Sequence, residues 1–180
     1  MKRKKEWFLD LDYGSSCGTI MSTIKKVFPQ ERDWTCSIAC FRTLTYALYN
    51  KVKNEDYFVN NYNIIKGPQN SQAISNWDIS VDKDVIIYGC YKKFDEDVAG
   101  NLTSLLRTHN VMVECMVNYA HWLVVLGYIQ LGDLEDDIII LYDPYYNTVR
   151  QLIADEFFAM WYDVGDNPIH RDYVAVRKEI

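Results

Sequence analysis

Four residues, far apart in the 180-residue sequence, have the side chains that nucleophilic catalysis by a thiol requires. Cys36 supplies a thiol, His121 an imidazole, Asp143 a carboxylate and Gln30 an amide. In this chemistry the imidazole accepts the thiol proton and the carboxylate orients the imidazole. The amide stabilises the negative oxygen that forms when the thiolate attacks a carbonyl. The order Gln, Cys, His, Asp therefore indicates a candidate catalytic site.

Cys36 is expected to lie where a helix begins. Within "PQERDWTCSIACFRTL" (residues 29–44), helical spacing of apolar residues starts after Asp33, and either Asp33 or Thr35 can cap the helix. Unpaired backbone N–H groups and the helix dipole in the first turn favour a thiolate over a thiol. The alternative is that Cys36 is an inert core side chain, since cysteine is among the most buried residue types.

The other four cysteines are not expected to react. Cys40 follows one turn later on the apolar face of the same helix, and Cys90 and Cys115 lie within apparent strands, so all three are predicted to be core residues. Cys17 lies in a predicted loop with no base near it. An odd, dispersed set of cysteines favours a reducing, cytoplasmic compartment. The absence of a CxxC pair and the presence of only three histidines argue against a zinc site. We therefore expect no disulfide framework, no metal site and no other cofactor.

The base and its orienting group are placed by two apolar runs. His121 opens "HWLVVLGY", a predicted strand, and Asp143 ends "IIILYD", another predicted strand, just before Pro144. If these strands pair, Asp143 can accept a hydrogen bond from His121 and fix its tautomer. A structural histidine and an ordinary strand-to-turn aspartate are the alternatives.

Gln30 precedes Cys36 by six residues, so its side chain can turn back towards the thiol. Together with the backbone N–H of Cys36 it would then form an oxyanion hole. The alternative is a surface glutamine.

The elements that must position these residues change type along the chain. Helical patterns come first and β-rich runs later, which predicts an α+β fold with a helical half packed on a largely antiparallel sheet. Helices are predicted within residues 18–28, from 33, at 70–77, 94–110 and 154–162, and strands at 85–91 (buried), 111–117, 121–129, 137–143 and 173–177. Residues 1–28 are interpreted as an N-terminal segment packing on or near a single domain, residues 29–180.

Charge and hydropathy narrow the possible partners. The net charge of −6 argues against a nucleic-acid surface, and no apolar run is long enough for a membrane span. The basic opening "MKRKK" is followed by acidic residues, which is not the pattern of a signal peptide. A peptide or protein substrate is the expected partner, and the sequence leaves the oligomeric state open.

These stretches resemble papain-like cysteine peptidases of the C39-like family, which includes the bacteriocin-processing peptidases. The first family motif, roughly Q-x-x-x-x-[DN]-C-G-x-A-C-L-x-M, is matched by Gln30, Cys36, Ala39, Cys40 and Phe41. "HWLVVLGY" resembles the histidine motif H-[FW]-V-V-V-x-G-[YF]. "IILYDPYYNTVRQLIADEFFAMW" resembles the third motif, a strand ending in Asp-Pro and followed by a phenylalanine and a tryptophan.

The resemblance covers about residues 28–162 and implies a papain-like fold. It also implies that Cys36 is the nucleophile, His121 the general base, Asp143 the orienting residue and Gln30 the oxyanion donor. Two departures are Ser37, where the family usually has glycine, and Thr35, where it usually has Asp or Asn. No transporter segment follows, so the double-glycine leader specificity of transporter-fused members is not carried over.

The expected function is therefore that of a cysteine peptidase, hydrolysing amide bonds, with transpeptidation as a related chemistry. The alternative is a catalytically silent papain-like module that binds a peptide or partner protein. A purely structural protein would explain the core cysteines but not the order of the four candidate residues.

Overall fold

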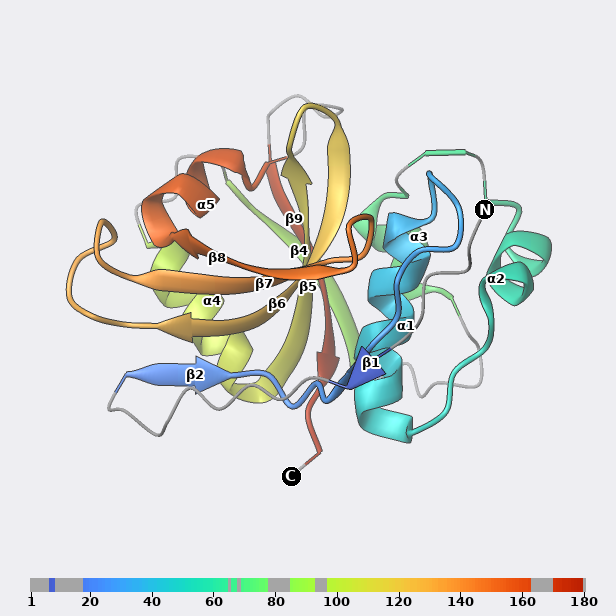
Figure 1. The fold of residues 1–180 in the computed structure, drawn as a ribbon, viewed down its shortest axis with the longest axis horizontal. Coiled ribbons are helices and arrows are strands. Elements are labelled where there is room, and N and C mark those ends of the chain that lie inside the picture. Colours follow the sequence, from blue (N-terminus) through green and yellow to red (C-terminus); the bar gives the residue numbers. More distant parts are fainter. Residues whose placement is uncertain are drawn as a thin grey trace.

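The computed structural model describes residues 7–8, 18–64, 66–67, 69–77, 85–92, 97–162 and 170–179. Over these residues the chain forms five helices, a seven-stranded sheet and a separate two-stranded sheet (Figure 1), and all strand pairs are antiparallel. The predicted α+β class is confirmed. No helix in this described part of the chain is long and apolar enough to cross a membrane.

The predicted order of helices first and strands later holds only from Cys36 onward, because three short strands precede the first helix. The helices are α1 (Cys36–Tyr49), α2 (Glu55–Asn61), α3 (Ser71–Ser75), α4 (Val98–Thr108) and α5 (Ala154–Met160). The strands are β1 (Trp7–Phe8), β2 (Thr19–Met21), β3 (Lys26–Val27), β4 (Ile86–Lys92), β5 (His109–Met116), β6 (Ala120–Ile129), β7 (Ile138–Asp143), β8 (Thr148–Ile153) and β9 (His170–Arg177). The large sheet has the order β4-β9-β5-β6-β7-β8, with β2 added to β6.

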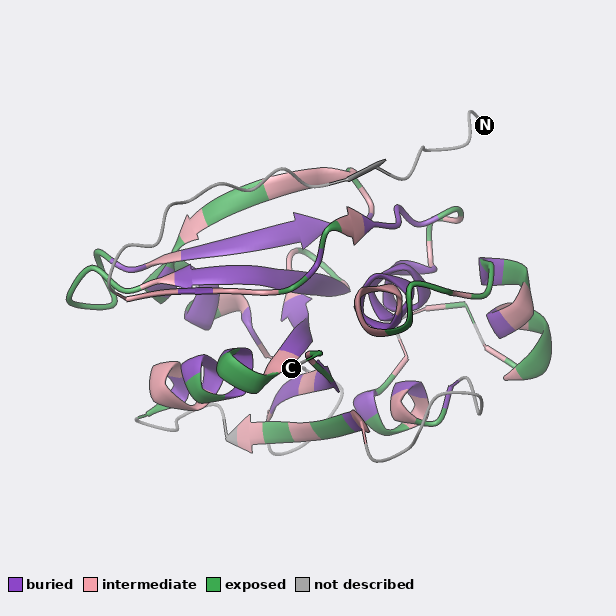
Figure 2. Cartoon of the chain, turned by 90° about the horizontal axis from the view of Figure 1, so that it is seen from below, coloured by how far each residue is buried: buried purple, intermediate pink, exposed green. Residues whose placement is uncertain are grey.

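The sheet separates two hydrophobic cores. Alternate residues of β6 divide between them: Trp122 and Val124 belong to the core shared with α1, whereas Leu123 and Val125 belong to the core shared with α4 and α5. This is the period-two alternation of a strand covered on both faces. Figure 2 shows that buried residues are concentrated in the strands and in α1. The helix that begins at Cys36 is therefore held firmly against the sheet that carries His121 and Asp143.

The helix predicted within residues 18–28 is wrong, because this segment forms β2 and β3. β2 pairs with the end of β6, with Thr19 opposite Ile129 and Met21 opposite Gly127, and Ile20 is buried in the core beside α4. A side chain at position 127 would collide with Met21, so the glycine permits this close approach. Strand pairing and burial of Ile20 override the weak helical spacing of the segment.

The strand predicted at 85–91 is present as β4, but its predicted burial is wrong. Among the strands that the structure describes, β4 lies at the edge of the large sheet and pairs with β9 alone, and Ile87, Tyr88 and Cys90 are exposed. Cys90 is therefore not a core residue, whereas Cys40 and Cys115 are fully buried as predicted. The prediction for Cys17 lies outside the described residues.

Candidate active site

α1 begins at Cys36, with Thr35 at the N-cap position, but no side chain in the described structure caps it. The predicted capping by Asp33 or Thr35 is wrong because the Thr35 hydroxyl is used in the preceding turn. Its Oγ1 donates to the carbonyl of Arg32 at 3.0 Å and accepts from the Arg32 N–H at 3.1 Å. The first-turn N–H groups of α1 therefore have no side-chain acceptor, which suits them to bind negative charge.

His121 and Asp143 meet at the start of β6 and the end of β7. His121 Nε2 lies 3.0 Å from Asp143 Oδ1, and both residues are buried. Asp143 Oδ1 also accepts a hydrogen bond from the Tyr145 N–H at 2.9 Å, which fixes the carboxylate. Cys36 is near enough to His121 for its interaction with the ring to raise the pKa of the imidazole. Since Nε2 faces Asp143, Nδ1 is the ring nitrogen that remains for the thiol.

Within the trio of Cys36, His121 and Asp143, the pKa values of His121 and Asp143 depend on the neighbouring members of the trio. Burial alone lowers the pKa of His121, but its interactions with Asp143 and Cys36 outweigh burial and raise it to about 9. Burial alone would raise the pKa of the Asp143 carboxyl. The hydrogen bond and charge interaction with His121, and hydrogen bonds from the backbone N–H groups of Tyr145 and Tyr146, outweigh burial and lower this pKa below its ordinary value. At neutral pH the site therefore favours an imidazolium beside an ionised Asp143.

Gln30 is buried next to this trio rather than on the surface. Its backbone N–H donates to the carbonyl of Pro144, the residue after Asp143, at 3.1 Å. Its side-chain Nε2 donates to the carbonyl of Arg32 at 2.7 Å, so this hydrogen bond does not go to Cys36. The bond to Arg32 fixes the amide and leaves a second Nε2 hydrogen, since a primary amide has two.

Several buried polar atoms without a hydrogen-bond partner lie around Gln30 and the start of α1, a region that we call the corner around Gln30. Within the described residues they are Gln30 Oε1, Arg32 Nη1, Ser37 Oγ and Glu55 Oε2. Three of these residues lie between Gln30 and Ser37, and the fourth contacts that segment. Arg32 Nη1 and Glu55 Oε2 lie 3.9 Å apart as an ion pair, so Gln30 Oε1 and Ser37 Oγ are the two of these atoms without either kind of partner. Buried polar groups are normally paired, so two unpaired ones on either side of Cys36 in the sequence support a functional site there.

Glu55, the first residue of α2, is a part of this corner that the sequence reasoning missed. Its fully buried carboxylate accepts a hydrogen bond from the Glu31 N–H at 2.9 Å and lies 3.9 Å from Arg32. Burial raises the pKa of Glu55 to about 7. The sequence does contain a signal for the helix that carries Glu55, because Asn54 followed by two acidic residues is the pattern of a helix start. In the structure the Asn54 side chain accepts a hydrogen bond from the Tyr57 N–H and caps α2.

Three tyrosines and an arginine around the trio were also missed. Tyr119 precedes β6, and Tyr145 and Tyr146 follow β7. Arg150 Nη2 lies 3.6 Å from Asp143 Oδ2, and its guanidinium stacks over Tyr146. Nothing in residue type or spacing distinguished these tyrosines from the other eleven in the chain.

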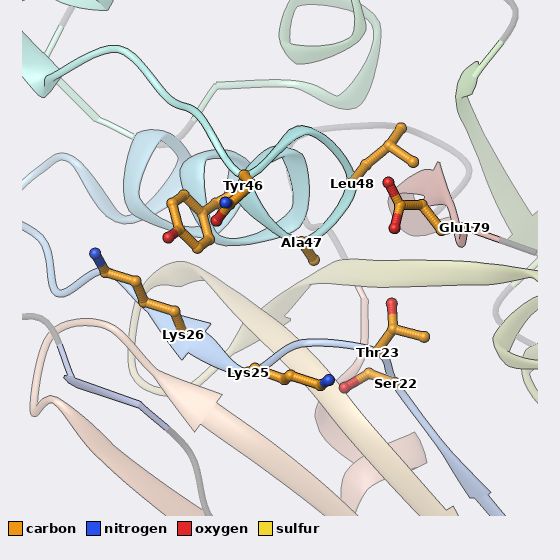
Figure 3. A pocket seen from close by; sticks show the side chains of 9 residues that line it. Ser22, Thr23, Lys25, Lys26, Tyr46, Ala47, Leu48 and Glu179 are labelled. Atoms are coloured by element: carbon orange, nitrogen blue, oxygen red, sulfur yellow. The ribbon is translucent and has the colours of Figure 1, made fainter.

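A cavity of about 740 Å³ lies away from the four candidate residues, at the other end of α1 (Figure 3). The segment between β2 and β3 and the last turn of α1 form most of its wall, with Glu179 completing it. Tyr46 lies ten residues after Cys36, about 15 Å along the helix. The cavity therefore belongs to a different part of the surface.

Known proteins provide no further evidence about the roles of Cys36, His121, Asp143 and Gln30. Neither a comparison with models of protein families nor a comparison with curated proteins finds a match to this chain.

Proposed function

We propose that this protein is a papain-like cysteine peptidase, or a close thiol-dependent amide hydrolase, with Cys36 as nucleophile. The observation that carries the proposal is the placement of His121, which is hydrogen-bonded to Asp143 and interacts with a cysteine at the uncapped start of a helix. The resemblance of three sequence blocks to C39-like peptidases supports the same roles.

In the proposed reaction, Cys36 and His121 start as a thiolate–imidazolium pair, with the thiol proton already on the ring, and the thiolate attacks the substrate carbonyl. The first-turn N–H groups of α1 and the second Nε2 hydrogen of Gln30 are the candidate donors to the oxyanion. His121 then gives its proton to the leaving nitrogen as the C–N bond breaks, which leaves a thioester on Cys36. Water, deprotonated by His121, resolves the thioester to a carboxylic acid and the free thiol.

The second candidate is a catalytically silent papain-like module that binds a peptide or a partner protein. Two observations favour it: Cys36 is only 5% exposed, and the side chain of Gln30 is hydrogen-bonded to the carbonyl of Arg32. In such a module the thiol would not be activated.

Alkylation by chloroacetamide at pH 7, followed by mass mapping, separates the two candidates. In the peptidase we expect Cys36 to react faster than the more exposed Cys90, and His121→Ala to slow Cys36 about tenfold or more. A peptide library is expected to be cleaved by the Cys90→Ser variant and not by Cys36→Ala. If Cys36 reacts no faster than Cys90, His121→Ala changes nothing and no peptide is cleaved, the binding module is the better description.

A further inference from the structure

Two hairpin turns bring tyrosine rings to His121. Tyr119 lies in the turn between β5 and β6, and its ring centroid is 5.8 Å from that of His121. Tyr145 lies in the turn between β7 and β8, 6.5 Å from His121, and Tyr146 packs on it at 5.0 Å. Because β6 and β7 are antiparallel neighbours, these two turns lie at the same end of the sheet.

The outer rings of this group are exposed, although the trio beneath them is buried. Tyr119 is 48% exposed and Tyr146 61%. Partial burial, with the nearby Tyr146, Tyr145, Asp143 and Cys36, raises the pKa of Tyr119, so its phenol is within electrostatic reach of the thiol. Large apolar rings left at the surface beside reactive groups are typical of a binding site.

The proposed reaction decides which part of a substrate these rings contact. His121 must deliver its proton to the leaving nitrogen, so the leaving group lies against the imidazole. The rings that pack edge-on against that imidazole, Tyr119 and Tyr145, therefore face the leaving group rather than the acyl group.

Charge decides which side chain fits. The Arg150 guanidinium lies 4.9 Å from the centroid of Tyr146, so a cation already occupies this ring. A lysine or arginine side chain in the leaving group would be repelled by Arg150, whereas a neutral aromatic ring could pack edge-on or offset against the tyrosines.

We propose that Tyr119 and Tyr145, together with the exposed ring of Tyr146 that packs on Tyr145, bind an aromatic side chain carried by the leaving amine, so that the enzyme cleaves amides whose leaving residue is Phe-like or Tyr-like. This inference rests on the proposed function. Its test must therefore separate failure of the tyrosine site from failure of the thiol chemistry.

Reaction of the acyl-enzyme with added amines provides that separation, because the leaving amine and an attacking amine occupy the same site by microscopic reversibility. p-Nitrophenyl acetate acylates the Cys36 thiolate and releases p-nitrophenolate. An amino acid amide then attacks the thioester, its N–C bond forms, the C–S bond breaks, and the proton passes from the amine to His121 and on to the thiolate sulfur. The product is the N-acetylated amino acid amide and the free thiol.

The experiment measures how the full-length acetyl-enzyme partitions between water and phenylalanine, leucine, alanine or lysine amide, with the Cys36→Ala background subtracted. We expect phenylalanine amide to capture the acetyl group roughly three- to tenfold better than alanine or lysine amide. Tyr119→Ala and Tyr146→Ala should remove most of this preference, which is a ratio measured on acetyl-enzyme already formed and so does not depend on how fast each variant is acetylated. Tyr88→Ala, at an exposed tyrosine on β4, is the matched control and should keep it.

The outcomes are distinct. Equal capture of all four amides by a readily acetylated enzyme would overturn the tyrosine site and leave the proposed function standing. A preference for phenylalanine amide that survives both substitutions would also overturn it. Absence of any Cys36-dependent acetylation would overturn the proposed function and this inference together.

Discussion

At the scale of single residues, His121 is the group on which the candidate site depends. Its ring is buried, yet its pKa is about 9, because Asp143 and Cys36 outweigh the effect of burial. Neither neighbour is close to His121 in sequence, and the hydrogen bond from Nε2 to Asp143 forms only when β6 and β7 pair. The charge on the ring is therefore a property of the folded protein.

We expect NMR titration to place the pKa of His121 near 9 in the wild type. In Asp143→Asn the main opposing interactions are lost, so burial should bring this pKa back towards 6.5 or below. Arg150→Gln is the matched control, because it removes a neighbour of Asp143 that does not contact His121. A titration near 9 in Asp143→Asn would contradict the stated cause.

The same shift predicts a pH dependence of stability. The pKa of His121 is raised in the folded state, so proton binding stabilises the fold fully below about pH 6.5, and this contribution is lost as the pH rises through about 9. Between pH 6 and 10 the wild type should lose on the order of 2–3 kcal/mol of unfolding free energy relative to His121→Gln. Urea unfolding at both pH values measures the difference, and equal losses would contradict it.

At the scale of elements, α2 supports the segment that leads into α1. Glu55 accepts from the Glu31 N–H and lies beside Arg32, while Phe58 of the same helix packs edge-on against Phe41 of α1 at 5.8 Å. α2 thus contributes both a polar contact to the corner around Gln30 and an apolar contact to the first core.

Burial raises the pKa of Glu55 to about 7. The effect of Glu55 on the pH dependence of stability is therefore opposite in sign to that of a carboxylate whose pKa is lowered by an ion pair. Its folded state holds the proton more tightly, so stability is greatest below about pH 4.5 and falls as the pH rises through about 7. Between pH 5 and 8 the wild type should lose on the order of 2 kcal/mol of unfolding free energy through Glu55, and the Glu55→Gln variant should lack this loss. Urea unfolding at both pH values measures the difference. Glu156→Gln, at an exposed acidic residue in the first turn of α5, is the matched control and should keep the wild-type loss between pH 5 and 8.

The packing of α1 gives a prediction that does not depend on catalysis. Phe41 is fully buried and makes edge-to-face contacts with Phe58 and Trp77, so Phe41→Ala should lower the unfolding free energy by about 3–5 kcal/mol. Tyr49→Ala, at the exposed end of the same helix, should cost well under 1 kcal/mol. Denaturant unfolding compares the two, and similar losses would contradict this packing.

Elements with a strong pattern were predictable, and those shaped by tertiary contacts were not. The run that starts at His121 and the run that ends at Asp143 are strands, as predicted. Their apolar residues are dense enough for the sequence of each run alone to predict a strand. β2 was mistaken for part of a helix because its partner, the end of β6, lies more than a hundred residues away. Sequence placed Cys36 at a helix start, but the hydrogen bond of Gln30 to Arg32 and the tyrosines around His121 depend on side-chain packing.

At the scale of the whole molecule, the sheet decides which thiols a reagent can reach. Cys40 and Cys115 lie in the two cores on either side of it, whereas Cys90 lies on the edge strand β4. Burial raises the pKa of both core thiols, which makes them still less reactive. The apparent strand run around Cys90 could not reveal that, among the described strands, β4 has a partner on one side only.

We therefore expect mass mapping after brief treatment with iodoacetamide to find label on Cys36 and Cys90 and none on Cys40 or Cys115. All four should react once urea unfolds the protein, which is the internal control. Labelling of Cys40 or Cys115 in the folded protein at the rate of Cys90 would contradict the two-core arrangement.

β9, the last strand of the described residues, lies in the interior of the sheet, between β4 and β5. Val174 and Val176 of that strand are part of the surface that receives α1. During synthesis Cys36 leaves the ribosome before β9 does, so the surface against which α1 packs is complete only once β9 has emerged. Removal of β9 should therefore disturb the surroundings of Cys36, although the two are far apart in the sequence.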